Sequence, residues 1–279
     1  MRILPHWLRR ILFNVFAWAL ILAVVSPLIW MIITSLKPQS ELFSIPPALL
    51  PEEVTFEHYR RLIMETAFLT YLRNSVILAG GTTALVIVVA TLGAHSLVRF
   101  SYRGRAGLAS AVLFTYLLPS VVLVIPVYFL MVNLGLVNSL LSLVIAYTTF
   151  ALPYALWLLR SFMAAIPPDL EAAAMVDGAS RMRAFIDVVL PQAAPGIIST
   201  AVFTAILAWN EYLFALVLVN RDSSRPLTTG VMNMLVTSFN IEWSLLMAAS
   251  VLMSVPLLIV FIFLQKYLTR GFGAGAVKG

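Results

Sequence analysis

The stretch Ile11–Thr34, ILFNVFAWALILAVVSPLIWMIIT, contains no Asp, Glu, Lys or Arg. About 20 predominantly apolar residues are enough for a helix to cross the hydrocarbon core of a bilayer, so this stretch predicts a membrane span. Its apolar run is too long for a secretory signal peptide, and no small-residue cleavage site follows before Lys37. We therefore expect this span to be retained rather than cleaved.

Five further stretches have the same apolar character: Leu72–Val98, Leu108–Val132, Leu140–Leu159, Ile197–Val219 and Leu245–Leu264. The composition agrees, because 61% of the residues are hydrophobic and only 11% are charged, against about 45–50% and about 25% in soluble domains. The sequence therefore predicts an all-α membrane protein with six transmembrane helices. The absence of cysteine excludes a disulfide scaffold, thiolate catalysis and cysteine-ligated metal sites.

Lys and Arg are distributed unevenly over the two sides that six spans define. Twelve of the 18 lie in the two termini, the loop after the second span and the segment after the fourth, and six lie on the other side. Cytoplasmic segments of membrane proteins collect Lys and Arg. We therefore expect a multi-pass protein of the cell (inner) membrane with both termini in the cytoplasm. The same rule accounts for the net charge of +6, and no basic run supports binding to nucleic acid.

Two segments outside the spans are predicted to be ordered. On the outer side, the spacing of Phe56, Tyr59, Leu62 and Ile63 predicts a short interfacial helix. On the cytoplasmic side, residues 160–196 form the only substantial segment, and its sequence predicts two short helices.

The first of these two helices is predicted for Leu170–Val176, a run rich in alanine. Pro167 and Pro168 end any helix that continues from the fourth span, and Pro168 then suits the first turn of a new helix. Gly178 is expected to end this helix, because glycine tolerates positive φ.

The second helix is predicted for Arg181–Leu190, with Ser180 as its N-cap and Pro191 as the residue that ends it. Together the two helices present a face of small alanine side chains outside the bilayer, which allows the surface of another protein to approach closely. The alternative is a connector that packs on the bilayer surface.

This segment resembles the cytoplasmic loop of ABC-importer membrane subunits, which combines Glu-Ala-Ala with a following glycine and a Leu-Pro pair. When the two are aligned on Gly178, the glutamate of the family's motif falls on Ala172, and Glu171 occupies the preceding position. A shift of one residue rotates a side chain by about 100° around a helix, so Glu171 is expected to replace that glutamate only in part. The resemblance implies contact with an ATPase subunit through Glu171, Ala172, Ala173, Asp177, Gly178, Ala179, Leu190 and Pro191.

Two further stretches narrow the resemblance to carbohydrate importers. Trp209-Asn210-Glu211-Tyr212 resembles their Trp-Asn-Glu/Asp signature, and Gly271–Gly279 resembles the glycine-rich tail of the maltose-permease subunit that lacks extra N-terminal spans. The resemblance covers essentially the whole chain and implies a type I ABC importer permease fold. A charge within a span normally faces a bundle interior or an aqueous path. Asn210 and Glu211 are therefore candidates for a pore or gate, with a structural pair bonded to a neighbouring helix as the alternative.

The resemblance also implies two contacts with partner proteins. In the outer loop, Thr237, Ser238, Phe239 and Asn240 match in position the loop that reaches into the binding protein in the maltose system. In the tail, Gly275 and Lys278 are expected to contact the ATPase subunits. A surface turn and a frayed terminus are the respective alternatives.

We expect three regions: an N-terminal helix and outer loop (1–70), a transporter core (71–267) that contains the coupling loop 160–196, and a tail (268–279). The resemblance implies a pore formed with a second permease subunit, two ATPase subunits, an extracytoplasmic sugar-binding protein, a sugar substrate and membrane lipid as partners. The chain has no Gly-x-x-x-x-Gly-Lys-Ser/Thr phosphate loop. It is therefore expected to be no enzyme and to hold no cofactor, with ATP and magnesium bound by the partner ATPase.

Two other classes of protein compete with this interpretation. A secondary transporter driven by an ion gradient would need several acidic residues within the membrane, and only Glu211 is available. A membrane-embedded enzyme would need clustered His, Asp or Glu, which the sequence lacks. His6, His58 and His95 have no metal-ligand spacing, so no metal site is expected. His95, at the end of a span, is expected to be a structural hydrogen-bond donor.

Overall fold

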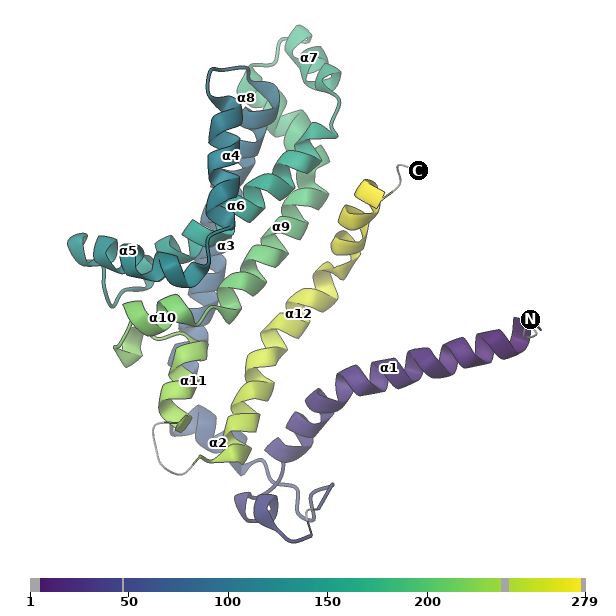
Figure 1. Cartoon of the computed structure of the whole chain (residues 1–279), viewed down its shortest axis with the longest axis vertical. Helices are drawn as coiled ribbons and strands as arrows, with labels where there is room; N and C mark the ends of the chain where they lie inside the picture. The colour runs from purple at the N-terminus through teal and green to yellow at the C-terminus, as the bar shows by residue number, and fades with distance from the viewer. Residues whose placement is uncertain (1–5, 47, 237–240, 277–279) are drawn as a thin grey trace. The chain divides into compact units, whose positions relative to one another are not determined.

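The computed structural model describes residues 6–46, 48–236 and 241–276, with side chains described over these ranges except at 235–236 and 266–276. The described residues form helices, turns and loops without any strand (Figure 1). They divide into two compact units. The smaller unit contains the residues up to 66 together with 233–255, and the larger contains 67–232 together with the residues from 256 onward.

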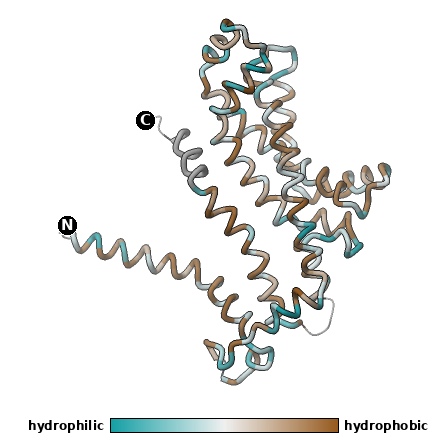
Figure 2. Tube along the Cα trace, turned by 180° about the vertical axis from the view of Figure 1, so that it is seen from behind, coloured by the Kyte–Doolittle hydropathy of each residue, from teal (hydrophilic) through white to brown (hydrophobic). Residues whose placement is uncertain are grey.

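Five helical stretches of the described chain are long and apolar enough to cross a membrane, and a bent pair of helices makes a sixth if it counts as one span. Figure 2 shows hydrophobic residues along these helices. The predicted all-α membrane class is therefore confirmed. The long helices are α1 (His6–Ser35), α3 (Phe68–Arg99), α6 (Leu140–Ala164), α9 (Leu190–Asn210) and α12 (Trp243–Ala276).

The third predicted span is not one continuous helix. It consists of α4 (Arg105–Tyr116) and α5 (Ser120–Asn133), which meet at an angle of 104°. Pro119 lies at the break and is the N-cap of α5. Proline lacks the N–H that a helix interior needs and disfavours helical backbone at the residue before it, which explains the break. The predicted span over Leu108–Val132 is therefore a bent pair of helices rather than one helix.

The fifth predicted span is also interrupted. The helix α9 ends at Asn210, Glu211 has an extended backbone, and a short helix α10 (Leu213–Leu218) follows. The prediction of a continuous span over Ile197–Val219 is therefore wrong. The physical cause is a side chain that caps α10, described below.

Pro191 does not end the helix predicted for Arg181–Leu190, which is a further correction. The helix α8 (Arg181–Ala184) continues through a π-helical turn, η2 (Phe185–Val189), directly into α9. A π turn carries an extra residue, so the ring of Pro191 avoids the carbonyl that it would meet in a regular helix. Residues 181–189 are thereby continuous with a membrane helix.

The smaller unit contains α1, a 3₁₀ turn η1 (Gln39–Phe43), α2 (Glu57–Met64) and the first half of α12. The short helix predicted around Tyr59 and Leu62 is confirmed as α2. Its Leu62 is fully buried, and the hydroxyls of Tyr59 and Ser35 are hydrogen-bonded at 2.6 Å.

The core of the larger unit forms around α3, which packs against α6 and α9. Where α3 and α6 meet, Ala90, Ala94, Ala151 and Ala155 are buried. Small residues let helix backbones approach closely in membrane proteins. A second cluster joins α3, α5, α6 and α10 around Leu78, Met131, Leu143, Tyr147, Phe214 and Leu218. The remaining elements are α7 (Pro168–Val176), a 3₁₀ turn η3 (Asp222–Ser224) and α11 (Leu227–Val236).

Candidate functional site

The helix α7 ends at Val176 as its sequence predicts and begins at Pro168, two residues before the predicted Leu170. Pro168 lies in its first turn together with Asp169, whose negative charge is favourable near a helix N-terminus. At its end, Gly178 has φ of +92°. The amide of Gly178 donates to the Met175 carbonyl at 3.1 Å, and the amide of Ala179 donates to the Ala174 carbonyl at 3.0 Å. This pair of bonds is a Schellman motif, so the predicted glycine stop is confirmed.

Ser180 then starts α8, again as predicted. Its hydroxyl accepts a hydrogen bond from the Arg183 amide at 3.3 Å. Figure 1 places α7 and α8 together at one end of the larger unit, with α11 toward the opposite end. The two short helices and the glycine between them therefore form a compact projection.

Glu171 faces inward, in contrast to most of the other candidate residues of α7. It is only 8% exposed. Its carboxylate lies 2.9 Å from Nε of Arg99 and 3.1 Å from Nε2 of His95, both in the last turns of α3. Arg99 also donates to the Ile166 carbonyl at 2.8 Å. An ionised carboxylate only accepts hydrogen bonds, so the histidine ring donates.

The outer surface of the projection is formed by the other candidate residues. Ala172, Ala173, Asp177 and Gly178 are exposed, and Ala179 is half-buried. Pro191 is exposed at the start of α9, where Leu190 packs partly against the core. The structure thus separates the predicted docking residues into one that anchors α7 to α3 and several that face outward.

The sequence predicts His95 as a structural donor, and its ring bonds to Glu171, whereas Arg99 is a residue of this site that the sequence did not single out. They lie 76 and 72 positions from Glu171, so no local motif connects them. Their spacing of four residues places both on one face of a helix end. Two polar side chains on one helix face near the end of a span were the only sequence signal for this contact.

Glu211 caps the broken helix. Its carboxylate accepts hydrogen bonds from the amides of Phe214 at 2.8 Å and Ala215 at 3.2 Å, the first turn of α10. The hydroxyl of Thr228 in α11 donates to the backbone carbonyl of Glu211 at 2.7 Å. Asn210 is exposed and donates to the Ile206 carbonyl within its own helix at 2.8 Å. The interruption between α9 and α10 therefore depends on the side chain and backbone of Glu211.

A cleft of about 590 Å³ opens beside this break. Asn210, Glu211 and Tyr212 lie on its wall together with Ser120 of α5. The two candidate pore residues thus line one hollow, which combines polar groups with aromatic rings. Its apolar wall consists of Phe150, Phe203, Ile206, Leu207, Leu213 and Phe214.

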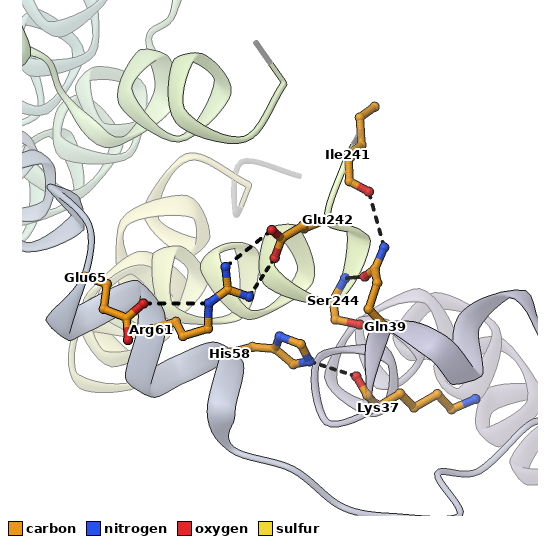
Figure 3. A network of polar contacts seen from close by, with 8 residues as sticks. All are labelled: Lys37, Gln39, His58, Arg61, Glu65, Ile241, Glu242 and Ser244. Carbon is orange, nitrogen blue, oxygen red and sulfur yellow. Dashed lines mark hydrogen bonds and ion pairs between the residues drawn. The ribbon is translucent and has the colours of Figure 1, made fainter. Parts of the chain in front are cut away.

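A polar network within the smaller unit holds the residues that lead into α12 (Figure 3). The guanidinium of Arg61 binds both carboxylate oxygens of Glu242, at 2.8 and 3.3 Å. This hydrogen bond raises the pKa of Arg61. The amide side chain of Gln39 donates to the Ile241 carbonyl at 3.4 Å and accepts from the Ser244 amide at 3.2 Å. Three segments of the unit are thereby joined.

The remaining candidate residues lie near the ends of the described segments or outside them. Thr237, Ser238, Phe239 and Asn240 fall outside the described residues, as does Lys278. Gly275 belongs to the last turn of α12. Among the described residues, no group of three or more His, Asp or Glu side chains is arranged to hold a metal ion.

Comparison with known proteins assigns this arrangement to a family. The family model described as "Binding-protein-dependent transport system inner membrane component" matches residues 86–273. The chain belongs to this family. The match includes the helix end that carries His95 and Arg99, the whole projection formed by α7 and α8, and the Glu211 break.

Two relatives match this family member over nearly its full length. The diacetylchitobiose uptake system permease protein DasC of Streptomyces coelicolor is 37% identical over 95% of this chain and 96% of its own length. The trehalose/maltose transport system permease protein MalG of Thermococcus litoralis is 34% identical over 98% of both. The chain is therefore an ABC transporter permease, and the alternative of a carrier driven by an ion gradient is wrong.

Solved structures confirm the fold of this family member. A bacterial ABC transporter involved in the import of the acidic polysaccharide alginate matches with a TM-score of 0.82 and 21% identity, over 96% of this chain and 99% of the other. The alginate transporter in complex with an alginate pentasaccharide-bound periplasmic protein matches with a TM-score of 0.68 and 16% identity, over 95% of this chain and 94% of the other. The expected type I importer permease fold is thereby confirmed.

Proposed function

We propose that this chain is one of two permease subunits that form the pore of an ATP-driven sugar importer. An extracytoplasmic binding protein delivers the sugar, and two ATPase subunits dock on the cytoplasmic side. The relatives named above, whose names specify diacetylchitobiose and trehalose or maltose, support sugars as the class of substrate. Twelve of the 18 Lys and Arg residues lie on the side that holds both termini and α7, which supports a cytoplasmic location for these parts.

The observation that carries this proposal is the outward face of α7. It offers Ala172 and Ala173 to solvent on a short helix whose other side is anchored by Glu171. An isolated helix of nine residues is not stable in water. Burying one side and exposing a face of small side chains suits a helix that must enter a cleft on another protein.

Chemical crosslinking in the assembled transporter tests the proposal. The chain contains no cysteine, so Ala173→Cys introduces a unique thiol. With the ATPase subunits cysteine-free except for one residue beside their surface cleft, a thiol crosslinker is expected to join the two proteins. The matched control is Glu53→Cys in the exposed loop before α2, which is expected to be modified only by reagents added from outside.

Transport in proteoliposomes completes the test. The complex is expected to accumulate sugar when ATP and the sugar-loaded binding protein are present, and an ionophore is expected to leave uptake unchanged. Failure of Ala173→Cys to capture the ATPase, together with uptake that ignores ATP, would contradict the proposed function.

A further inference from the structure

The helix α3 is held by side chains at both of its ends. It has 32 residues and no proline inside it, so it extends over about 48 Å at a rise of 1.5 Å per residue. Its C-terminal end contacts the cytoplasmic projection, and its N-terminal end contacts the segment that contains η3 and leads into α11. The residues that make these contacts, up to Gly230 in the first part of α11, belong to the larger unit.

At the C-terminal end, the contacts reach both limbs of the projection. Glu171 of α7 binds His95 and Arg99, and Arg99 also binds the carbonyl of Ile166 just before α7. The ring of Phe185, which follows α8, packs on the ring of His95 with centroids 4.5 Å apart. His95 and Glu171 are each 8% exposed. A buried ion pair of this kind is strongly destabilised when one partner is removed.

At the N-terminal end, buried amide and hydroxyl groups hold the segment from Asp222 to Leu227. The side-chain amide of Asn74 donates to the carbonyls of Ser223 at 3.0 Å and Arg225 at 2.9 Å. The hydroxyl of Ser75 accepts a hydrogen bond from the Leu227 amide at 2.8 Å. Asn74 is fully buried and Ser75 is 2% exposed, so water does not compete for these bonds.

One turn closer to the N-terminus of α3, Tyr71 completes this attachment. Its hydroxyl donates to a carboxylate oxygen of Asp222 at 3.2 Å. A Cβ placed on Gly230 of α11 would come within 2.3 Å of the Tyr71 ring, so the ring lies directly against the α11 backbone. The N-terminal end of α3 is therefore joined to η3 and to α11.

We propose that α3 transmits the displacement of α7 to the segment 222–230 on the opposite side of the membrane, with Glu171 and Asn74 as the positioning residues at its two ends. The proposal rests on the proposed function, since the displacement comes from the ATPase subunits. Without the Glu171 contacts, α7 would be free to rotate about the residues that flank it, Pro167 and Gly178. Its movement would then be absorbed at these two positions.

A double-mutant cycle in the reconstituted transporter tests this transmission. The variants are Glu171→Gln, Asn74→Ala and their combination, and the control is Asp187→Asn, which removes an exposed contact with Arg183 on the same projection. Each single variant is expected to retain its ATPase subunits and to lower sugar transported per ATP hydrolysed by about tenfold. The combination is expected to be no worse than the more severe single variant, because both changes interrupt one chain of contacts.

Several results would overturn the proposal. These are wild-type coupling in Glu171→Gln, effects that multiply to about a hundredfold in the combination, loss of the ATPase subunits from Glu171→Gln, and a loss in Asp187→Asn as large as that in Glu171→Gln. If the wild-type complex transports sugar and its α7 captures the ATPase, these results reject the transmission alone. If it does neither, the proposed function itself is rejected.

A distance measurement tests the same transmission without any of these substitutions. Spin labels on Val176→Cys, which is 86% exposed in α7, and on Ser223→Cys are placed in the otherwise wild-type chain. Their separation is expected to stay constant between ATP-free and ATP-bound complexes while the distance between the two ATPase subunits changes. A change in the label separation would contradict transmission through α3.

Discussion

Replacing Glu211 by alanine removes both hydrogen bonds that cap α10. The amides of Phe214 and Ala215 then lose their acceptors at 2.8 and 3.2 Å, while the Thr228 bond to the backbone carbonyl remains possible. We expect the break between α9 and α10 to lose its defined geometry. Because Asn210 and Glu211 line the same cleft, uptake of sugar should fall although the helices on either side are unchanged.

The size of the effect follows from these two bonds. Loss of an N-capping side chain costs about 0.5–2 kcal/mol, and hydrogen bonds to a charged group contribute about 1.5–3 kcal/mol each. Since α10 has only six residues and Glu211 is partly exposed, we expect about 1–3 kcal/mol. A free energy of that size shifts an equilibrium about 5- to 150-fold. Glu211→Gln keeps one acceptor oxygen and should give an intermediate loss.

The assay is ATP-dependent uptake per assembled complex in proteoliposomes, with co-purification of the ATPase subunits as the measure of assembly. The matched control is Glu65→Ala in the smaller unit, where an exposed carboxylate lies 3.9 Å from Arg61. The control should transport within about twofold of the wild type, because exposed pairs contribute little. Wild-type uptake by well-assembled Glu211→Ala and Glu211→Gln would refute the reasoning.

Three further predictions concern positions where the structure is sterically or electrostatically demanding. Gly178→Ala places a side chain at φ of +92°, at a cost of about 1–2 kcal/mol, and should weaken binding-protein-stimulated ATP hydrolysis severalfold. The control Gly107→Ala has open space around its Cβ position and should leave this activity unchanged. Equal activities of the two variants would contradict the prediction. Gly196→Ala brings a Cβ within 2.4 Å of an aromatic ring of α6. This overpacking costs about 1–3 kcal/mol and should lower the midpoint of thermal unfolding. An unchanged midpoint would show that the ring moves freely. Arg61→Glu and Glu242→Arg should each weaken the stimulation of ATP hydrolysis by the binding protein up to about fivefold. The combined variant should restore the stimulation, because the ion pair is formed again with its charges exchanged. A combined variant as weak as either single variant would argue against the ion pair.

Much of the architecture follows from local features of the sequence. The apolar stretches predict the spans because a helix satisfies all its backbone hydrogen bonds within itself and only its side chains need match the bilayer. The stop at Gly178 and the cap at Ser180 were also predictable, since both depend on the conformation and hydrogen bonds of neighbouring residues.

The effect of each proline on its helix could not be predicted from the local sequence. Pro126, Pro153 and Pro256 lie inside helices, whereas Pro119 lies at a bend of 104°. Pro191 was predicted to end a helix, but a π turn carries the chain past it. The same residue type therefore has opposite outcomes, and the difference arises from the backbone bonds and packing around each proline.

The direction of Glu171 depended on contacts that no local pattern contains. From the sequence it belonged with Ala172 and Ala173 as part of an outward motif, but in the structure it binds His95 and Arg99 in the end of α3. The same holds for Glu211, whose place in the signature was visible while its role as a cap was not. The apolar stretches and the helix-capping residues are local features of the sequence, and they are sufficient to identify the helices and the family. Which side chain is buried against which helix end depends on how distant segments pack, and only the folded chain brings those segments together.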